Sequence, residues 1–223
     1  MTVTGYDRVP LSIGTTAAGG PDLDSVDAHV LYLFALVGEG LAAATTAFLE
    51  GDRDARRVLA ANDQKVDDLQ LQIEDLVCAE LTDKRPTSRE EVRHLLLVLQ
   101  IVPELERSGD LVEHIARRAA QGLAAEISPL GRTLIERMGE VATDMWRLAA
   151  IAYREADPTA AQRLRLRDDE LDDLHVTLTV ELANVSMPVP VAIEMGLVAR
   201  FFERLGDHAV NVTRRLATSA PAA

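Results

Sequence analysis

The sequence predicts an all-α protein of six helices, arranged as two tandem antiparallel three-helix bundles that are related by an internal repeat. Apolar residues recur in steps of three and four, as between Val98 and Ala119, which is the spacing of a helix with one buried face. No alternation of apolar and polar residues is long enough for a sheet, and aromatic residues make up only 4% of the chain. Two groups of residues also occur twice in the same order, which predicts two related halves.

The first half of the chain contains three helical segments. Residues 1–21 are rich in Gly, Thr, Pro and Ser, and we expect a flexible N-terminal tail there. A first helix is expected over about 24–50, because Gly51 ends it. The stretch 85–88 separates a second helix from a third, and Ser88 is the expected N-cap of the third helix.

The second half repeats this division. Ser128 is an expected N-cap, with Pro129 at the first helical position of the fourth helix. Asp157 followed by Pro158 has the same pattern and predicts the start of the fifth helix. The proline-containing stretch 186–190 separates the fifth helix from the sixth. We therefore assign residues 22–124 to a first three-helix repeat and residues 125–219 to a second.

The composition excludes some classes of partner. The chain has 223 residues, with 36 acidic against 23 basic side chains and a formal net charge of -13. Such a charge disfavours nucleic acid and anionic lipid as ligands. The single cysteine, Cys78, cannot form an intrachain disulfide and is expected in the core, and no secretory signal is visible. The apolar run at 95–102 is too short to span a bilayer, so we expect a cytoplasmic protein with no direct membrane insertion.

The internal repeat is seen in two motifs. Asp-x-x-apolar-Asp-Asp-Leu occurs at 63–69 and again at 168–174, an offset of 105. Glu-Arg-x-Gly-Asp occurs at 106–110 and again at 203–207, an offset of 97. The difference places eight fewer residues between the motifs in the second half, most simply at the turn between the second and third helices. Gly109 and its counterpart in the second half are expected to allow close helix approach.

Each repeated motif carries two acids four residues apart, which share one face of a helix. If neighbouring antiparallel helices bring their pairs level, each bundle gathers four carboxylates, and each close pair repels by about 1–3 kcal/mol at ~6 Å. Hard or borderline cations such as iron, manganese or magnesium would compensate this repulsion. The alternative is a solvated acidic face. The predicted metal ligands are Asp63, Asp67, Glu106, Asp110, Asp168, Asp172, Glu203 and Asp207.

Several histidines lie near these motifs in the sequence. His114 and His175 follow the acidic pairs closely enough to extend a patch, and whether they are ligands stays open. His208 points away from the acidic face and is expected to pack against a polar partner. Glu91 and His94 have the Glu-x-x-His spacing of di-iron bundles, but no second copy exists and Glu91 is about 22 Å of helix from Glu106.

The repeated residues resemble a known family. Residues 200–212 read Arg-Phe-Phe-Glu-Arg-Leu-Gly-Asp-His-Ala-Val-Asn-Val, and this phrase is similar to the signature of PhoU proteins. Glu106-Arg107-Ser108-Gly109-Asp110 is a second, partial copy, and the Asp-x-x-apolar-Asp motifs resemble the family's second-helix motif. The resemblance covers about residues 24–217. The sequence departs from the family pattern at Gln70 and His175, and at Pro103, which stands where Arg200 stands in the second half.

The resemblance implies two three-helix bundles with metal clusters at the repeated acidic motifs. It also implies a regulatory role: an accessory protein of the phosphate ABC transporter that acts with a membrane sensor histidine kinase to damp the phosphate-starvation response. Such a protein would be peripheral at the inner face of the membrane through its partners. Association into a homodimer stays open.

Two other classes of function remain as alternatives. A metal-dependent oxidase or hydrolase would need open coordination positions and a base or redox-suited histidines, whereas these ligands are mostly carboxylates. No phosphate-binding loop, nucleophile elbow or Cys-x-x-Cys pair is present, so we do not expect an enzyme. A purely structural interaction module would use the acids to bind a basic partner directly.

Overall fold

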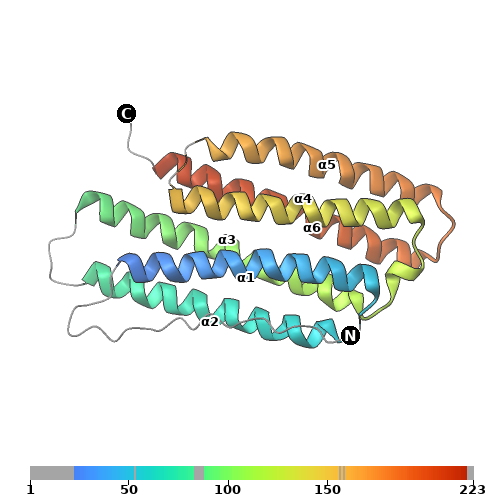
Figure 1. Ribbon diagram of the computed structural model, residues 1–223, viewed down its shortest axis with the longest axis horizontal. Coiled ribbons are helices and arrows are strands. Elements are labelled where there is room, and N and C mark those ends of the chain that lie inside the picture. Colours follow the sequence, from blue (N-terminus) through green and yellow to red (C-terminus); the bar gives the residue numbers. More distant parts are fainter. Residues whose placement is uncertain (1–22, 53, 83–87, 156, 158, 220–223) are drawn as a thin grey trace, which may run out of the picture.

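The computed structural model describes residues 23–52, 54–82, 88–155, 157 and 159–219. The tail expected at 1–21 lies outside the described residues. The described part of the chain contains six α-helices and one short 3-10 helix, with no strand, which confirms the predicted fold class (Figure 1). They are α1 (Leu23–Glu50), α2 (Ala55–Thr82), α3 (Arg89–Ala119), η1 (Leu123–Ala125), α4 (Pro129–Glu155), α5 (Ala160–Asn184) and α6 (Val189–Ser219).

Most predicted helix ends are confirmed by their local contacts. The Ser88 hydroxyl accepts a hydrogen bond from the Glu91 backbone N–H at 3.1 Å, and the Glu91 carboxylate accepts one from the Ser88 N–H at 2.6 Å. This reciprocal capping box fixes the start of α3. The Ser128 hydroxyl accepts from the Gly131 N–H at 3.0 Å, at the start of α4. Gly51 has a φ of +68°, a conformation that suits glycine and ends α1.

The start of α5 differs from its prediction. Asp157 is not the N-cap, because its carboxylate accepts hydrogen bonds from the Thr159 N–H at 2.8 Å and from the Thr159 hydroxyl at 2.7 Å. These contacts close a tight turn before the helix. Thr159 is the N-cap residue, it makes no side-chain capping bond, and α5 begins at Ala160.

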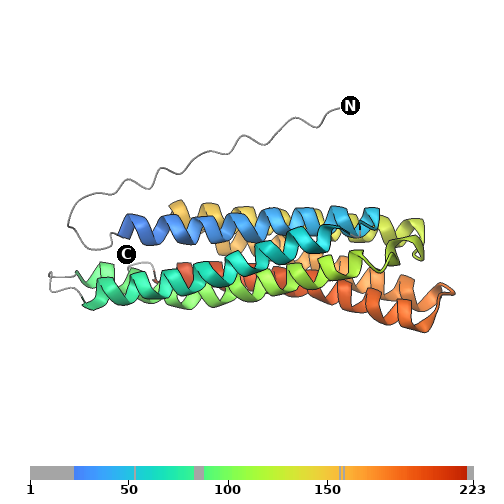
Figure 2. The same ribbon diagram turned by 90° about the horizontal axis from the view of Figure 1, so that it is seen from below.

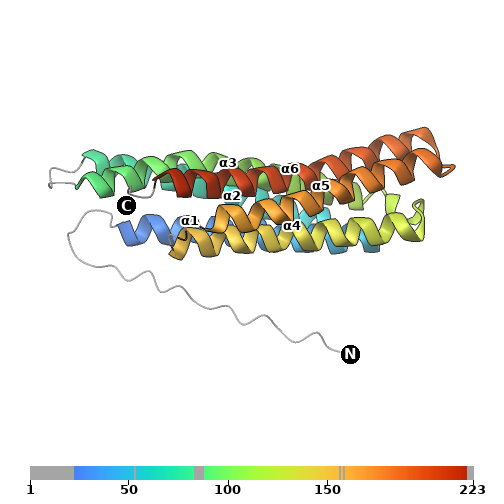
Figure 3. The ribbon, with the colours of Figure 1, turned by 90° about the horizontal axis from the view of Figure 1, so that it is seen from above.

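The helices form an elongated molecule of two layers. α1 packs against α4 in one layer and α3 packs against α6 in the other (Figures 2 and 3). α2 and α5 lie along the two outer edges (Figure 1). One continuous apolar core fills the space between them, with Phe34, Phe48, Trp146 and Phe202 among its largest side chains. The two bundles are therefore joined through four central helices.

The structure places two residues that the sequence analysis singled out, Cys78 and Pro103. Cys78 is exposed rather than in the core, because its neighbour Val77 is the residue that α2 turns inward and adjacent positions are about 100° apart. Pro103 lies inside α3, which continues from Arg89 to Ala119.

Among the described helices, α1 alone is long and apolar enough to cross a membrane by length and composition. In the most apolar part of α1, 56% of the residues are buried inside the protein. Its inner face supplies Val26, Val30, Leu33 and Leu41 to the core. These contacts are those of a central bundle helix.

Candidate metal centres

The first acidic patch lies between α2 and α3, where the fold brings together Asp63, Asp67, Glu106 and Asp110. Burial raises the pKa of Asp63, and the charges of Asp67 and Asp110 raise it further. Burial also raises the pKa of Glu106, with added repulsion from Asp110, Asp67 and Asp63. Because carboxylates on two helices influence one another in this way, the predicted grouping of the four acids is present.

The second acidic patch lies between α5 and α6 and contains Asp168, Asp172, Glu203 and Asp207. Burial and the charges of Asp172, Asp207, Asp169 and Glu203 raise the pKa of Asp168 to about 6. Burial and the Asp207 charge also raise the pKa values of Asp172 and Glu203. The repeated motifs therefore produce two equivalent patches of mutually repelling carboxylates.

Repeated glycines allow the helices of each patch to approach. A methyl group on Gly109 would lie 3.1 Å from the Val66 side chain of α2. A methyl group on Gly206 would lie 2.7 Å from Leu171 and 2.9 Å from the Asp168 carboxylate of α5. The predicted structural role of both glycines is confirmed, and Gly206 also leaves the space that Asp168 occupies.

The donor set suits a hard cation. In the described part of the chain, one buried carboxylate oxygen in each patch has no hydrogen-bond partner: Oδ1 of Asp63 in the first and Oε2 of Glu203 in the second. Such oxygens are costly unless a proton or cation satisfies them. No group of three or more His, Cys, Asp or Glu side chains among the described residues is arranged to hold a metal ion as it stands. Ligation would therefore require these surface carboxylates to turn toward a common point.

The patches have neighbours that the motif pattern did not identify. Arg200 forms an ion pair with Glu203, and its charge lowers the pKa of that carboxyl against the effect of burial. Pro103 occupies the matching position in the first half, so the first patch lacks this arginine. Glu113 adds its charge to the first patch and Asp169 adds its charge to the second. Arg200 and Glu113 could have been found from sequence, because each lies three residues from a patch acid on its own helix.

His114 and His175 lie beside the patches. The charge of His114 lowers the pKa of Asp63, and the charge of His175 lowers the pKa values of Asp172 and Glu203. A ring nitrogen of His114, Nδ1, is 2.6 Å from the Asp110 carbonyl oxygen. Metal ligation by either histidine stays a prediction.

The other two histidines of interest make structural contacts. Nδ1 of His208 is 2.9 Å from Oε2 of Glu104 in the interior, which confirms the expected packing role. Nε2 of His94 is 2.7 Å from Oδ1 of Asp27, while Glu91 caps α3. The Glu-x-x-His spacing at 91–94 thus serves helix capping and helix packing.

Comparisons with known proteins agree on one family. A family profile described as "PhoU domain" matches residues 30–119 and again residues 135–216. The phosphate-specific transport system accessory protein PhoU homolog 1 of Mycobacterium tuberculosis is 33% identical over 184 residues, covering 81% of this chain and 83% of that protein. The phosphate-specific transport system accessory protein PhoU of Edwardsiella tarda is 25% identical over 210 residues, covering 92% of this chain and 86% of that protein.

Solved structures show the same fold. The crystal structure of PhoU from Pseudomonas aeruginosa superposes with a TM-score of 0.80 at 24% identity, covering 88% of this chain and 96% of that one. The phosphate transport system regulatory protein PhoU from Streptococcus pneumoniae superposes with a TM-score of 0.79 at 21% identity, covering 88% and 94%. At these identities the likeness concerns the arrangement of helices.

Proposed function

Because the chain belongs to the PhoU family, we propose that it is a non-enzymatic regulator of phosphate uptake and of phosphate-starvation signalling. Its curated relatives are named as accessory proteins of the phosphate-specific transport system, which supports this role. In the proposal it acts in the cytoplasm by binding components of a phosphate ABC transporter and a sensor histidine kinase. These partners would hold it at the inner face of the membrane.

We further propose that each acidic patch binds iron, manganese or magnesium ions. The supporting observation is that four carboxylates gather twice, at equivalent positions of the repeat, with raised pKa values in both patches. Asp63, Asp67, Glu106 and Asp110 would hold metal on the first bundle, and Asp168, Asp172, Glu203 and Asp207 on the second. A bound cation would offer positive charge to an anion such as phosphate or to a carboxylate of a partner.

The residues of the patches determine the conditions for binding. The pKa of Asp168 near 6 means that a proton competes with metal for this carboxylate in mildly acidic solution. Arg200 beside Glu203 also competes with a cation, so the second patch must release that ion pair to use both oxygens of Glu203. The first patch has no such arginine.

The regulatory role is tested with a reporter of phosphate-starvation genes in a host that lacks its own copy of this protein. The intact chain should restore repression in high phosphate, while Glu203→Gln with Asp207→Asn should restore it only weakly. Glu126→Gln, at an exposed acid beyond η1, is the matched control and should restore it fully. Repression that persists in high phosphate without the protein would contradict the regulatory role. Full repression with the double variant would contradict the role of the second patch.

A further inference from the structure

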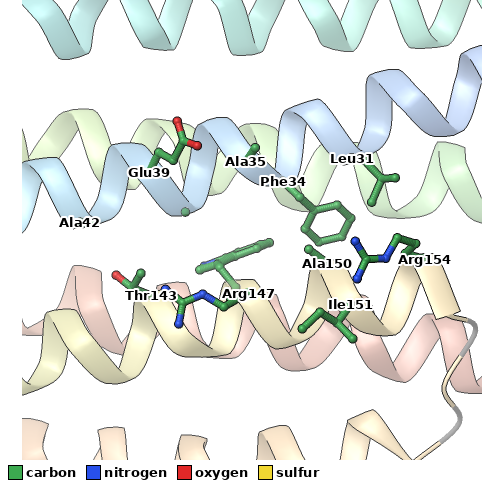
Figure 4. Close-up of a pocket in the computed structure, with 12 residues that line it drawn as sticks. Leu31, Phe34, Ala35, Glu39, Ala42, Thr143, Arg147, Ala150, Ile151 and Arg154 are labelled. Carbon is green, nitrogen blue, oxygen red and sulfur yellow. The ribbon is translucent and has the colours of Figure 1, made fainter. Parts of the chain in front are cut away.

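A long groove runs along the seam between α1 and α4, on a different pair of helices from the acidic patches. The two helices are antiparallel there, and two cavities of about 630 and 400 Å³ follow one another along the seam. They share Ala42, Thr143 and Arg147 in their walls, so they form one depression, which we call the α1–α4 groove. Figure 4 shows the larger half, with Phe34 of α1 facing Ile151 and Arg154 of α4.

The two halves of the groove are related by the internal repeat but differ in chemistry. At the offset of 105, the positions of Leu31, Ala35 and Glu39 in the larger half correspond to those of Glu136, Glu140 and Asp144 in the smaller half. The larger half is therefore mainly apolar, whereas the smaller half is lined by three acids and by Arg137 and Arg147.

Charges mark the two ends of the groove. Arg154 lies at the end of the larger half, where its only ion pair within the described residues is a 3.5 Å contact with Glu155. Glu136 lies at the opposite end, beside Arg137, whose charge is paired with Glu140 and Glu170. In the middle, Arg147 pairs with Asp144 at 2.7 Å. The groove therefore has one basic end, one acidic end and a balanced centre.

The outward face of α1 within the groove is unusually apolar. Ala35 and Ala42 are exposed there, and a methyl group on Gly38 would meet no atom within 4 Å. The exposed acid between them, Glu39, points its carboxylate away from α4, so the strip that faces α4 is apolar (Figure 4). A helix face that stays in water usually carries charged side chains, whereas an uncovered apolar strip marks an interaction surface. Trp146 also lines the groove, and its buried Nε1–H has no acceptor among the described residues.

We propose that the α1–α4 groove binds an amphipathic helix of a partner protein. From Leu31 to Leu49 the groove extends about 27 Å, or five helical turns, at ~1.5 Å per residue. This length exceeds that of most small ligands, and a concave seam between two helices accommodates a third helix. Charge complementarity fixes the chemistry of the partner: acidic residues at the end that meets Arg154, basic residues at the end that meets Glu136, and an apolar face between them. The proposal does not depend on metal binding.

The test uses the full chain and a synthetic helix of 18 residues that contains leucines on one face, glutamates at one end, lysines at the other, and no tryptophan. Binding is measured by fluorescence anisotropy of a dye on the peptide, because Trp146, the only tryptophan of the protein, is buried in the wall of the groove. The mixed-charge peptide should bind at least about tenfold more tightly than peptides with lysines at both ends or glutamates at both ends. Equal binding of all three peptides, or no binding, would overturn the proposal.

Two variants separate groove binding from other effects. A Cβ at Gly38 meets no atom within 4 Å, so Gly38→Phe should place its ring in the groove and weaken binding of the mixed-charge peptide by about tenfold or more. Gly196→Phe on α6, where a Cβ also meets no atom within 4 Å, should not weaken it. Arg154→Glu should shift the preference to the peptide with lysines at both ends. If Gly38→Phe leaves peptide affinity unchanged, the groove is not the site. If the intact chain sediments as a dimer and Gly38→Phe as a monomer, a second copy occupies the groove and the partner-helix proposal is wrong.

Discussion

Asp168 is the carboxylate whose surroundings most strongly oppose its charge. It is flanked by Asp172, Asp169, Asp207 and Glu203, and its pKa of about 6 lies above the value of 3.8 expected when unfolded. The folded protein therefore holds a proton more tightly than the unfolded chain, and this group's contribution to stability falls as the pH rises from about 4 to 6.

We predict that Asp168→Asn raises the melting temperature in chelator at pH 7.5, because it removes a charge that the neighbouring acids repel. It should also reduce the pH dependence of melting between pH 4 and 6. With Mn²⁺ present the variant should gain less stability than the intact protein, since a ligand is lost. Thermal denaturation with and without metal measures all three effects. A variant less stable than the intact chain in chelator would contradict the account of the repulsion.

The stability of the fold also depends on pH through the contact of Asp27 with His94 and Tyr153. Burial raises the pKa of Asp27, but hydrogen bonds with His94 and Tyr153 outweigh burial and lower it. The hydrogen bond to Asp27 raises the pKa of His94 above its usual 6.5. The histidine therefore stabilises the fold fully below pH 6.5, and this contribution is lost as the pH rises through its folded pKa.

We accordingly expect His94→Gln to lower stability at pH 6 more than at pH 8.5. The comparison is made by urea denaturation at the two pH values. His29→Gln on α1 is the control, because Nδ1 of His29 lies 2.6 Å from the Ser25 carbonyl oxygen within its own helix. An equal loss of unfolding free energy at both pH values would show that the charge of His94 does not stabilise the fold.

At the scale of helices, Gly196 and Gly206 lie on the same helix, α6, but differ in the space around them. Gly206→Ala places a methyl group within 3 Å of Leu171 and Asp168, whereas Gly196→Ala places one in open space. We predict that Gly206→Ala lowers the free energy of unfolding by about 1–3 kcal/mol. Gly196→Ala should raise it by up to about 1 kcal/mol, because alanine favours the helix. Chemical denaturation measures both values, and equal effects would contradict the close approach of α5 and α6.

Helix ends were predictable where a local signal decides them. Ser88 and Ser128 were identified because a cap needs only an oxygen and a nearby backbone N–H. The same signal at Asp157 does not produce a cap, because its carboxylate closes a turn with Thr159 instead. The prediction that Cys78 lies in the core was wrong. Because α2 has a narrow buried face and many polar residues, the sequence does not determine which side of the helix a single residue occupies.

At the scale of the molecule, a polar cluster around one buried acid joins the two bundles. Glu104 of α3 is 5% exposed and lies 2.9 Å from Nδ1 of His208 and 3.1 Å from Arg215, both on α6. The Arg215 side chain is 35% exposed and burial lowers the pKa of His208, so the loss of Glu104 costs less than the breaking of a fully buried ion pair. We predict that Glu104→Gln lowers the free energy of unfolding by about 1–3 kcal/mol. Glu140→Gln, in an exposed pair with Arg137, should cost less than about 1 kcal/mol. Denaturation of both variants gives the comparison, and similar losses would contradict a special role of the cluster.

The repeat predicted the six helices and the two groups of acids, because both follow from spacing along the chain. It did not predict how the bundles share a core through α1, α3, α4 and α6, since packing between distant helices leaves no local pattern. The Glu104 cluster and the α1–α4 groove arise from that packing, so sequence alone did not identify them. Metal ligation likewise depends on where each carboxylate turns, which spacing does not determine.

We propose that two equivalent patches each bind metal, and the stoichiometry of bound metal is the decisive measurement. Isothermal titration of chelator-treated protein with Mn²⁺, checked by elemental analysis, should show two separable sets of sites. Glu106→Gln with Asp110→Asn should remove only the set on the first bundle, and Glu203→Gln with Asp207→Asn only the set on the second. No metal bound by the intact chain, or unchanged binding by both double variants, would contradict the claim.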